Sequence, residues 1–548
     1  MNNRFIQKSL FYILVSFLLL VVYPLDFYFP TGNQCIYFFW GIKNTGLGFL
    51  ENDFLASQPD PFPLFSMLVT YSSKLFGNSI FLFWYWIINL LYVVSVFEIA
   101  EEVGKQLGFK LNKFFFTALF LFANSTLIWG GFFSHFFNFD LRWVWDSGFA
   151  EQGILRGYLQ PSVFGVFILI SFMFFIKRNF LLAFATAAIA SCFHANYFLV
   201  SGVFIAVYIL ILLREKSYKK ATTGSLISFL IVLPYLIYVY KNFGSTSPET
   251  AEYIRNHIKG HPHFDYLIWM NAKAFLQLLL IVFSLWLIRK SSFFLPLFFS
   301  LITLIVLTAF TYFSGNIFLL NITPWRISVV LVPIAVTIIT AHISSTNNSK
   351  IRNLIFAFVY TIVLSALYFR VFGNISPEYI FKWKIITAVS FVIVTLITFI
   401  SEKYFKPDFF NKAASVKIIF LLLCLGISGI VLHKKDRKNE TELMNFVKEN
   451  LSQNQQYLIP PEMTDFRVTT GAPVFVDSCI YHSNALSEWD KRMEITNRFF
   501  TKTDSVLLDS LVRNCGITHI IARKEIKLIA SKEIFSNERY IIFDVNER

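Results

Sequence analysis

The chain has 548 residues, of which 55% are hydrophobic and only 15% are charged, and its mean hydropathy is +0.57. Ordinary soluble domains carry about 25% charged residues, so this composition excludes the soluble globular class and predicts an all-α polytopic membrane protein. The net charge of +14 does not call for a nucleic-acid partner, because most Lys and Arg residues fall in short tracts between apolar runs, where they set membrane topology.

The apolar runs predict about thirteen membrane-spanning helices, since a span needs about 20 mostly apolar residues. The first run follows a basic start but lacks a small-residue cleavage site, so we interpret it as an uncleaved span. In chain order the predicted spans cover residues 6–23, 79–101, 114–133, 161–176, 180–194, 197–213, 223–241, 266–288, 293–313, 327–344, 353–371, 384–400 and 417–433. The runs at 180–194 and 197–213 also fit a single broken helix.

Alternate loops carry clusters of basic residues, which predict the side of the membrane on which each loop lies. By the positive-inside rule these loops and the N-terminus are cytoplasmic. An odd number of spans then places the C-terminal tail on the outer face. The loops predicted on that face are longer and richer in polar residues, so we expect the functional site among residues 24–64, 134–160, 242–264, 314–326 and 372–383.

The tail differs in composition from the rest of the chain, and we predict a transmembrane domain over residues 1–433 and a small extracytoplasmic α/β domain over residues 434–548. About 110 residues suffice for one core. Helices are predicted at KNETELMNFVKENL, SNALSEWDKRMEITNRFF and DSVLLDSLVRNCG, and strands at QYLIP, VFVDS, THIIAR and YIIFDV. Cys479 and Cys515 either pair in an oxidising compartment or stay unpaired.

The first outer loop contains three acids in the segment FLENDFLASQPDPFPLF. Asp53 is either a catalytic acid or the cap of a helix that begins near Phe54. Glu51 is its supporting neighbour. Asp60 lies between prolines, which predicts a turn.

Further candidates lie in the other outer segments, and their chemistry suits the transfer of a sugar from a phosphate. A carboxylate accepts a proton from an attacking hydroxyl or amine, a guanidinium matches the geometry of phosphate, and a histidine donates to phosphate or binds a metal. The polar candidates are Asn33, Gln34, Asp140, Arg142, Asp146, Gln160, His194, Arg255, His261, His263 and Arg326.

Several of these residues also have plainer interpretations. His261 and His263 lack a third metal ligand beside them, which favours a substrate-facing role over a metal site. Arg326 at the end of a predicted span can equally snorkel to the interface, and Arg142 between two tryptophans can anchor the aromatic belt. The chain contains no Walker A, Gly-x-Ser-x-Gly, His-Glu-x-x-His or Cys-x-x-Cys motif, which argues against an ATP-driven pump, a serine hydrolase and a zincin.

A series of short segments, in this order, resembles the GT-C superfamily of integral-membrane glycosyltransferases, in an uncharacterised bacterial branch. The segments are TGNQ at 31–34, LENDFL around Asp53, LQPS at 159–162, FHANY at 193–197, HPHF at 261–264, PWR at 324–326 and, in the tail, DFRVTTGAPVFVD and SEWDKR. The resemblance implies a multi-pass fold in the bacterial cytoplasmic membrane that uses a polyprenyl-phosphate-linked sugar on the outer face. It also implies that Asp53 is the essential first-loop acid and that Arg326 contacts the lipid phosphate.

The chain also departs from the pattern of this superfamily. The oligosaccharyltransferase branch carries an acidic pair such as Asp-x-Asp in its second outer loop, whereas here Asp140 and Asp146 lie six residues apart, and the WWD-type tail signature is absent. These departures weaken the case for protein N-glycosylation and for a metal. A divalent cation, Mg²⁺ or Mn²⁺, stays open as the one candidate cofactor.

We therefore predict a GT-C-type membrane glycosyltransferase that moves a sugar from a polyprenyl-phosphate-linked donor to a lipid, glycan or protein acceptor of the cell envelope. Asp53 would be the catalytic acid, with Arg326, His261, His263 and Arg255 around the donor phosphate. Two other classes stay open, an O-antigen polymerase or ligase and a non-enzymatic lipid or glycan transporter. The first-loop acids and the folded tail disfavour the former, and the clustering of charge at one face disfavours the latter.

Overall fold

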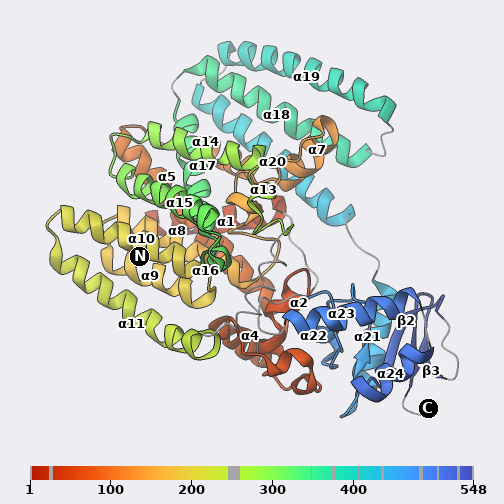
Figure 1. Cartoon of the computed structure of the whole chain (residues 1–548). Helices are drawn as coiled ribbons and strands as arrows, with labels where there is room; N and C mark the ends of the chain where they lie inside the picture. Colours follow the sequence, from red (N-terminus) through yellow and green to blue (C-terminus); the bar gives the residue numbers. More distant parts are fainter. Residues whose placement is uncertain are drawn as a thin grey trace.

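The computed structural model describes residues 3–23, 29–244, 260–346, 348–372, 377–404, 407–432, 437–479, 486–502, 505–526 and 531–545. A helical part makes up most of the chain, and a smaller part with a β-sheet follows it at the C-terminal end (Figure 1). The mixture of many apolar helices and one small sheet confirms the predicted fold class, a polytopic helical membrane protein with a small C-terminal α/β domain.

Among the described residues, the helical part contains thirteen helices of eleven or more residues that correspond to predicted spans, together with the 14-residue helix α4, which lies in a predicted outer loop and the segment after it. The longer helices are α1 (Asn3–Val22), α5 (Ile80–Leu107), α6 (Lys113–Ala123), α8 (Val166–Ile176), α9 (Phe180–Phe193), α10 (Tyr197–Arg214), α11 (Tyr218–Phe243), α14 (Ala272–Leu287), α15 (Phe294–Ser314), α17 (Ser328–Ser344), α18 (Ser349–Phe372), α19 (Pro377–Tyr404) and α20 (Pro407–Leu432). The connecting segments form α2 (Gln34–Tyr37), α3 (Phe39–Lys43), α4 (Pro63–Phe76), α7 (Phe133–Phe137), α13 (Tyr266–Trp269), α16 (Ile317–Ile322) and the turns η1 (Leu50–Asn52), η2 (Phe54–Ser57), η3 (Leu127–Phe132), η4 (Phe149–Glu151), η5 (Pro161–Gly165) and η6 (Pro324–Ile327).

Every predicted span coincides with an apolar helix or a bent helix pair of the described chain. Eight helices are long and apolar enough to cross a membrane, and a ninth span forms if the bent pair Lys113–Ala123 and Leu127–Phe137 counts as one. The remaining predicted spans match the shorter apolar helices Pro161–Ile176, Phe180–Phe193, Ala272–Leu287 and Lys384–Ile400. Helices α9 and α10 are separate and pack against each other, so the alternative of one broken helix is wrong.

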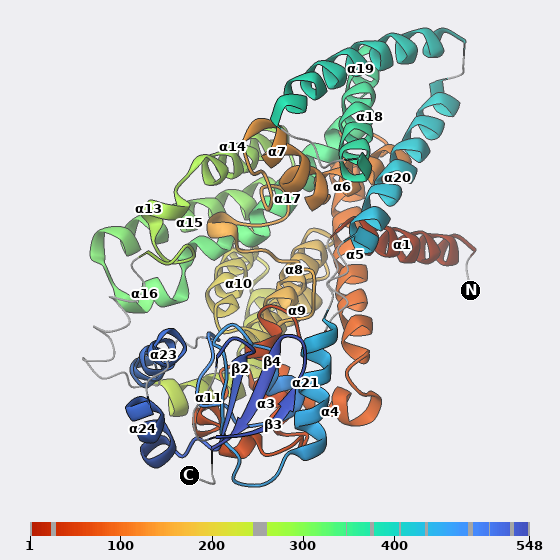
Figure 2. The same cartoon turned by 90° about the vertical axis from the view of Figure 1, so that its right-hand side faces the viewer.

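One span is far more enclosed than the others. Of the apolar window in Pro324–Ser344, which contains η6 and α17, 78% is buried, whereas the other long spans bury between 22% and 50%. Helix α17 packs against α5, α6 and α14, while α18, α19 and α20 form a layer at one side (Figures 1 and 2). A residue at the start of α17 therefore belongs to the interior of the bundle.

The polar loops gather at one end of the helices, which we call the loop face: residues 29–62, 138–160, 260–271 and 315–327. The opposite end carries an ion-pair network of the predicted cytoplasmic segments. There Lys8 pairs with Glu98 at 2.5 Å and with Glu101 at 2.9 Å, Lys113 pairs with Glu101 at 2.6 Å, and Lys177 pairs with Glu98. Because these lysines and glutamates neutralise one another, we do not place the functional site at that end.

The C-terminal part is a four-stranded sheet of order β1-β2-β4-β3 with helices on both faces (Figure 2). Its elements are α21 (Lys438–Asn450), β1 (Tyr457–Leu458), α22 (Phe466–Thr470), α23 (Leu486–Thr501), α24 (Ser505–Cys515), β2 (His519–Arg523), β3 (Lys532–Ser536) and β4 (Tyr540–Asp544). Strand β1 pairs in parallel with β2, and the other pairs are antiparallel. Because successive strand residues face opposite sides, Ile520 joins the core under α23 and α24, and Ile521 joins the core under α21 and α22.

The tail predictions hold in part. The three predicted helices and the strands at QYLIP, THIIAR and YIIFDV are present, whereas α22 and β3 were missed. The strand predicted at VFVDS is wrong: only Val474 forms a bridge, with Tyr457, because the backbone of this segment bonds to other partners, including Asp53. The domain boundary predicted at 433/434 lies outside the described residues.

A buried ion triad joins the first loop to the C-terminal part. Arg467 on α22 donates from Nε to Asp53 Oδ2 at 2.7 Å and from Nη1 to Asp477 Oδ2 at 3.0 Å. All three residues are at most 3% exposed. Asp53 also accepts the N–H groups of Val474 at 2.8 Å and Leu55 at 2.9 Å. A buried charge is tolerated only when it is paired and hydrogen-bonded, and here Asp53 depends on Arg467 and Val474 of the C-terminal part.

Close backbone packing surrounds this triad. Phe49 N–H donates to Gly471 O at 2.9 Å, and a Cβ placed on Gly48 would lie 2.3 Å from that oxygen, so only glycine allows the approach. Nearby, the side chains of Cys35 and Cys479 are hydrogen-bonded, and this contact together with burial raises the pKa of the Cys479 thiol. All five cysteines are free, so Cys479 and Cys515 stay unpaired.

A second contact brings α23 to the loop face. Leu486 at the start of α23 is buried against Phe264 of the HPHF segment, and Leu320 of α16 and Trp489 pack on the same cluster. Figure 2 shows α23 below α16 and beside the loop face. The C-terminal part therefore covers one edge of the region in which the candidate residues lie.

The triad predicts a large loss of stability when its central cation is removed. Arg467→Met leaves two buried carboxylates without a counter-charge, which should destabilise the protein by about 3–5 kcal/mol. The thermal unfolding midpoint of the detergent-solubilised full-length protein should fall, and proteolysis of the C-terminal part should begin at a lower temperature.

Arg523→Met serves as the matched control, because Arg523 pairs with Glu462 in the same part but both side chains are about 60% exposed, at 62% and 59%. That pair should contribute less than about 1 kcal/mol. Equal midpoints for Arg467→Met and the wild type would contradict a docking role for the triad.

The excess acid in the triad also predicts a pH effect. Burial raises the pKa of Asp477 to about 6, although the charge of Arg467 opposes this rise. The ordinary Asp value is about 3.9, so between about pH 6 and pH 4 the folded protein binds a proton that the unfolded chain does not. The contribution of Asp477 to the free energy of unfolding therefore grows as the pH falls through 6 and is lost as the pH rises. Relative to Asp477→Asn, the wild type should gain up to about 1.4 kcal/mol per pH unit between about pH 6 and pH 4. Parallel stability curves for the two proteins would contradict this assignment.

Candidate functional site

The second loop, residues 138–160, crosses the loop face and is held there from three sides. Phe149 N–H donates to Ser328 Oγ on α17 at 2.7 Å. His263 Nδ1 donates to the carbonyl of Ala150 at 2.8 Å. Gln277 on α14, which is 3% exposed, donates from its amide to the carbonyls of Trp143 at 3.0 Å and Ser147 at 2.8 Å. The loop therefore has a defined position between α14, α17 and the HPHF segment.

A cationic cluster lies where these segments meet, consisting of Arg326, Arg156, His194 and His263 with the amide of Asn196. The Asn196 amide oxygen faces the Arg326 guanidinium and accepts from Nη1 at 2.9 Å. Arg326 Nη1 also lies 3.4 Å from His194 Nε2. Within the part of the chain that the structure describes, neither Arg326 nor Arg156 forms an ion pair with an acid.

Electrostatics explain how this cluster carries its charge. Burial and the charge of Arg326 hold the pKa of His194 well below its usual value. Burial lowers the pKa of His263 to about 4, with the charges of Arg326, Arg156 and His261 as further causes and the hydrogen bond to Ala150 opposing. Both histidines are therefore neutral near pH 7, and the positive charge rests on two guanidinium groups. The charge of this cluster is complementary to an anion, and a bound anion would raise the pKa of both histidines.

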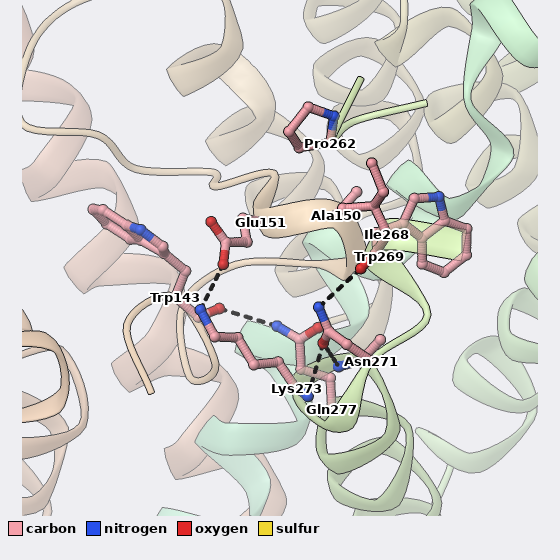
Figure 3. Close-up of a pocket in the computed structure, with 10 residues that line it drawn as sticks. Trp143, Ala150, Glu151, Pro262, Ile268, Trp269, Asn271, Lys273 and Gln277 are labelled. Atoms are coloured by element: carbon pink, nitrogen blue, oxygen red, sulfur yellow. Dashed lines mark hydrogen bonds and ion pairs between the residues drawn. The ribbon is translucent and has the colours of Figure 1, made fainter. Parts of the chain in front are cut away.

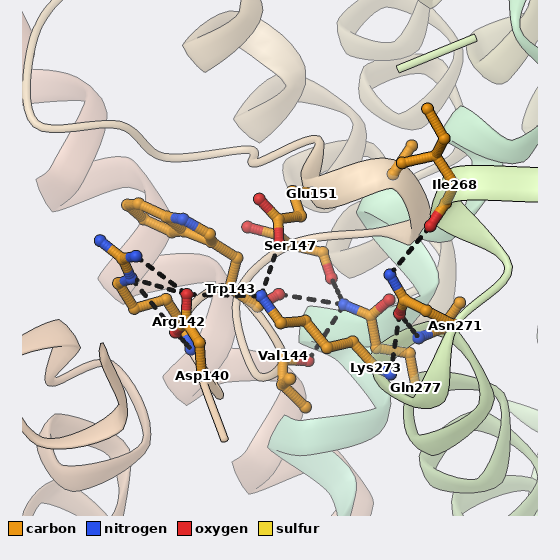
Figure 4. A network of polar contacts seen from close by, with 12 residues as sticks. Asp140, Arg142, Trp143, Val144, Ser147, Glu151, Ile268, Asn271, Lys273 and Gln277 are labelled. Carbon is orange, nitrogen blue, oxygen red and sulfur yellow. Dashed lines mark hydrogen bonds and ion pairs between the residues drawn. The ribbon is translucent and has the colours of Figure 1, made fainter. Parts of the chain in front are cut away.

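A small pocket of about 130 Å³ lies next to the cluster, between the second loop and the start of α14 (Figure 3). Its lining consists of Trp143, Ala150, Glu151, Pro262, Ile268, Trp269, Asn271, Lys273, Ala274 and Gln277. Lys273 pairs with Glu151 at 2.5 Å and lies 3.6 Å from Asp140, which in turn holds Arg142 at 2.9 Å (Figure 4).

The predicted acid Asp53 does not face this pocket. It caps η2 by accepting from Leu55 N–H, which is the capping role that the sequence left open, and it holds Arg467. Its side chain is 0% exposed. Its predicted catalytic role stays a prediction. Glu51 beside it is exposed in η1, and Asp60 accepts from Phe62 N–H at 2.8 Å, which confirms the predicted turn.

Three of the predicted supporting residues hold loops together. Gln34 is 3% exposed and donates to the carbonyl of Leu159 at 3.1 Å. The backbone N–H of Asn33 donates to the hydroxyl of Tyr158 at 3.3 Å. Gln160 donates to Ser162 Oγ at 2.7 Å. The contacts of Gln34 and Asn33 fasten the first loop to the end of the second loop, whereas that of Gln160 is local.

The acids and the arginine of the second loop separate into two environments. Arg142 is 51% exposed and clamps Asp140, whose pKa falls because the hydrogen bonds and charge of Arg142 outweigh its partial burial. Asp146 is 3% exposed, and burial raises its pKa to about 6 against the opposing effects of the hydrogen bond from Tyr23 and the charge of Arg156. Neither acid belongs to an Asp-x-Asp pair.

The HPHF segment places both histidines at the cluster, with ring centroids 5.4 Å apart. Arg255, predicted beside them, lies outside the described residues. Among the described residues no group of three His, Cys, Asp or Glu side chains is arranged to hold a metal ion. The divalent cation therefore stays a prediction, and no step proposed below uses one.

Two residues that line the pocket were missed because they fall inside a predicted span. Lys273 and Gln277 lie on α14, in a run that was interpreted as the membrane-crossing segment 266–288. Polar side chains in an otherwise apolar run are costly to bury in lipid. The presence of Lys273 and Gln277 in this run was therefore the sequence feature that could have identified them. Arg326 was found, and it is half-buried in η6, between the buried residues Trp325 and Ile327.

The fold matches that of a solved membrane protein. Over 99% of this chain and 98% of that chain, the structure is similar to ArnT from Cupriavidus metallidurans bound to undecaprenyl phosphate, with a TM-score of 0.50 and 12% sequence identity. The apo structure of the same protein matches with a TM-score of 0.49, 12% identity and the same coverage. The match confirms the predicted GT-C-like fold.

Sequence comparison reaches only a part of the chain. Residues 438–495, which include α21, α22 and the start of α23, match the family model described as a domain of unknown function, DUF6798. No curated protein matches the chain.

Proposed function

We propose that this chain is a membrane glycosyltransferase that takes a sugar from a polyprenyl-phosphate-linked donor and transfers it to a lipid, glycan or protein acceptor. Two independent features support the proposal. The first is the shared fold with ArnT, whose structure holds undecaprenyl phosphate. The second is the cationic cluster at the loop face.

The observation that carries the proposal is the environment of Arg326. It lies at the start of the most buried span, it is held by neutral partners, and no described acid pairs with it. Arg326 itself is half-buried, between the buried residues Trp325 and Ile327. A partly buried guanidinium that no described acid pairs with is costly at the end of an apolar span unless it has a function. A phosphate group supplies that counter-ion, and its oxygens match the fork of N–H donors on arginine.

The cluster also suits the chemistry of transfer. When the acceptor attacks the anomeric carbon, the bond from that carbon to the phosphate oxygen breaks, and negative charge grows on the departing lipid phosphate. Arg326 and Arg156 stabilise this charge where it develops. The acceptor hydroxyl or amine gives its proton to a carboxylate within hydrogen-bonding reach.

The proposed orientation places the loop face and the C-terminal part outside the cytoplasm, in the cytoplasmic membrane of a bacterium. The basic tracts at the opposite helix ends support it by the positive-inside rule. The charged candidates lie at one end of the helices rather than at mid-membrane, which favours transfer over transport.

Arg326→Ala should strongly reduce transfer, because it removes the guanidinium that stabilises the negative charge developing on the leaving phosphate. Loss of one such donor typically lowers the rate by about 10²–10³-fold. Arg326→Lys should retain part of the activity, since it keeps the charge without the fork. The measurements are the glycan product in cells by mass spectrometry and the binding of undecaprenyl phosphate to the purified protein.

Arg289→Ala is the matched control for this experiment. Arg289 is exposed between α14 and α15, at the opposite end of the helices, and lies over the ring of Trp286 at 4.9 Å. A normal amount of product from Arg326→Ala at a normal protein level would contradict the proposed phosphate site.

Asp53→Asn separates the two roles of the first-loop acid. Asparagine retains the cap, and Asp477 still neutralises Arg467, so the docking role predicts near-normal product and an unfolding midpoint within a few degrees of the wild type. Asp53→Leu, which loses the cap and both hydrogen bonds, should unfold at a lower temperature. Lost product from Asp53→Asn with an unchanged midpoint would assign the acid to catalysis instead.

A further inference from the structure

The pocket beside the cationic cluster has the dimensions and lining of a site for part of a ligand. Its volume of about 130 Å³ is below the ~300 Å³ at which ligand pockets commonly begin, so it accommodates one ring and not a whole lipid-linked sugar. Figure 3 shows its polar side chains on one side and the indole of Trp269 on the other.

The aromatic lining is rigid. Trp269 is 5% exposed and stacks on Phe149, with centroids 5.9 Å apart and ring planes 15° apart. Its other neighbour is Trp325, at 5.1 Å, the residue before Arg326. The buried indole N–H of Trp269 has no hydrogen-bond partner among the residues that the structure describes. A buried donor of this kind calls for an acceptor, and tryptophan offers a flat apolar face next to it.

The polar lining is balanced in charge. Lys273, 17% exposed, pairs with Glu151, which is 48% exposed and keeps its second carboxylate oxygen for another partner. Asp140 and Arg142 form the adjoining pair. Among the lining residues one acid and one base leave no net charge, so the pocket favours hydroxyls, which both donate and accept, over a charged group.

The backbone joins this pocket to the cationic cluster. Ala150 and Glu151 adopt φ values of +59° and +55°, a conformation that non-glycine residues rarely adopt and that is concentrated at functional sites. Their carbonyls are held by His263 and Arg156, respectively, both members of the cluster. The strained turn therefore holds the backbone of Glu151, whose side chain lines the pocket, in direct contact with the residues of the proposed phosphate site.

We propose that this pocket binds the ring of the donor sugar and that the ring is an uncharged pyranose. The apolar C–H face of the ring would lie on Trp269, and its hydroxyls would bond to Glu151, Lys273 and the Trp269 N–H. The assignment to the donor rests on the proposed function, because the donor sugar is bonded directly to the phosphate and the pocket adjoins the cluster. Glu151 and Lys273 then determine which sugar is accepted.

The test compares two probes on the purified full-length protein. Undecaprenyl phosphate reports on the cationic cluster, and free glucose, galactose and mannose, measured by ligand-observed NMR, report on the pocket. Glucuronate and glucosamine serve as the charged counterparts. The first variant, Glu151→Gln, keeps the side-chain size and removes the charge. The second, Trp269→Phe, keeps an aromatic ring and removes the indole N–H. Glu215→Gln is the control, because Glu215 pairs with Arg178 at the opposite end of the helices. Unfolding midpoints show that each variant is folded.

At least one neutral hexose should bind more tightly than glucuronate or glucosamine, and Glu151→Gln and Trp269→Phe should weaken that binding at least tenfold. Both variants should bind undecaprenyl phosphate within twofold of the wild type, while Arg326→Ala should show the reverse pattern.

Undecaprenyl phosphate binding without any hexose binding, or hexose binding that neither pocket variant changes, would overturn the pocket assignment alone. Preference for a charged sugar would overturn the assignment of an uncharged ring. Failure of the wild type to bind undecaprenyl phosphate would instead overturn the proposed function.

Discussion

The arrangement of the loop face depends on one buried cation. Arg467 is enclosed by two parts of the chain, and it is neutralised by Asp53 from the first loop and Asp477 from the tail. Arg467 and Asp477 already pair within the tail, whereas the buried Asp53 carboxylate finds its counter-charge only across the contact. Docking therefore supplies Asp53 with Arg467, and an unpaired ion in the interior would cost several kcal/mol. That constraint brings Leu486 against Phe264, beside the HPHF segment.

Charge at the loop face is divided between three environments. The docking triad carries one more acid than base, the pocket pairs Glu151 with Lys273, and no described acid forms an ion pair with the arginines of the cationic cluster. Since oppositely charged groups would neutralise one another if mixed, this separation preserves a positive site for an anion. The strained turn at Ala150 and Glu151 is the structural link between pocket and cluster.

The membrane-spanning helices could be predicted from the sequence, whereas the candidate site could be predicted only in part. Apolar runs identify spans because lipid leaves no water for the backbone, so each run must satisfy its hydrogen bonds within a helix. Arg326, His194 and His263 were found since polar residues at span ends are rare. Lys273 and Gln277 were missed because a mostly apolar run conceals a few polar positions. The strand at VFVDS was wrong because its backbone bonds to Asp53, far away in the chain.

The sequence by itself determined the class of protein, the order of its spans and the identity of most polar residues at the loop face, because these follow from local composition and from the cost of burying charge. Only the tertiary structure decided the role of each acid. Asp53 holds Arg467, and Glu151 faces a pocket, since which charges meet depends on segments hundreds of residues apart. The partner, and not the residue type, sets whether a carboxylate is structural or available to a ligand.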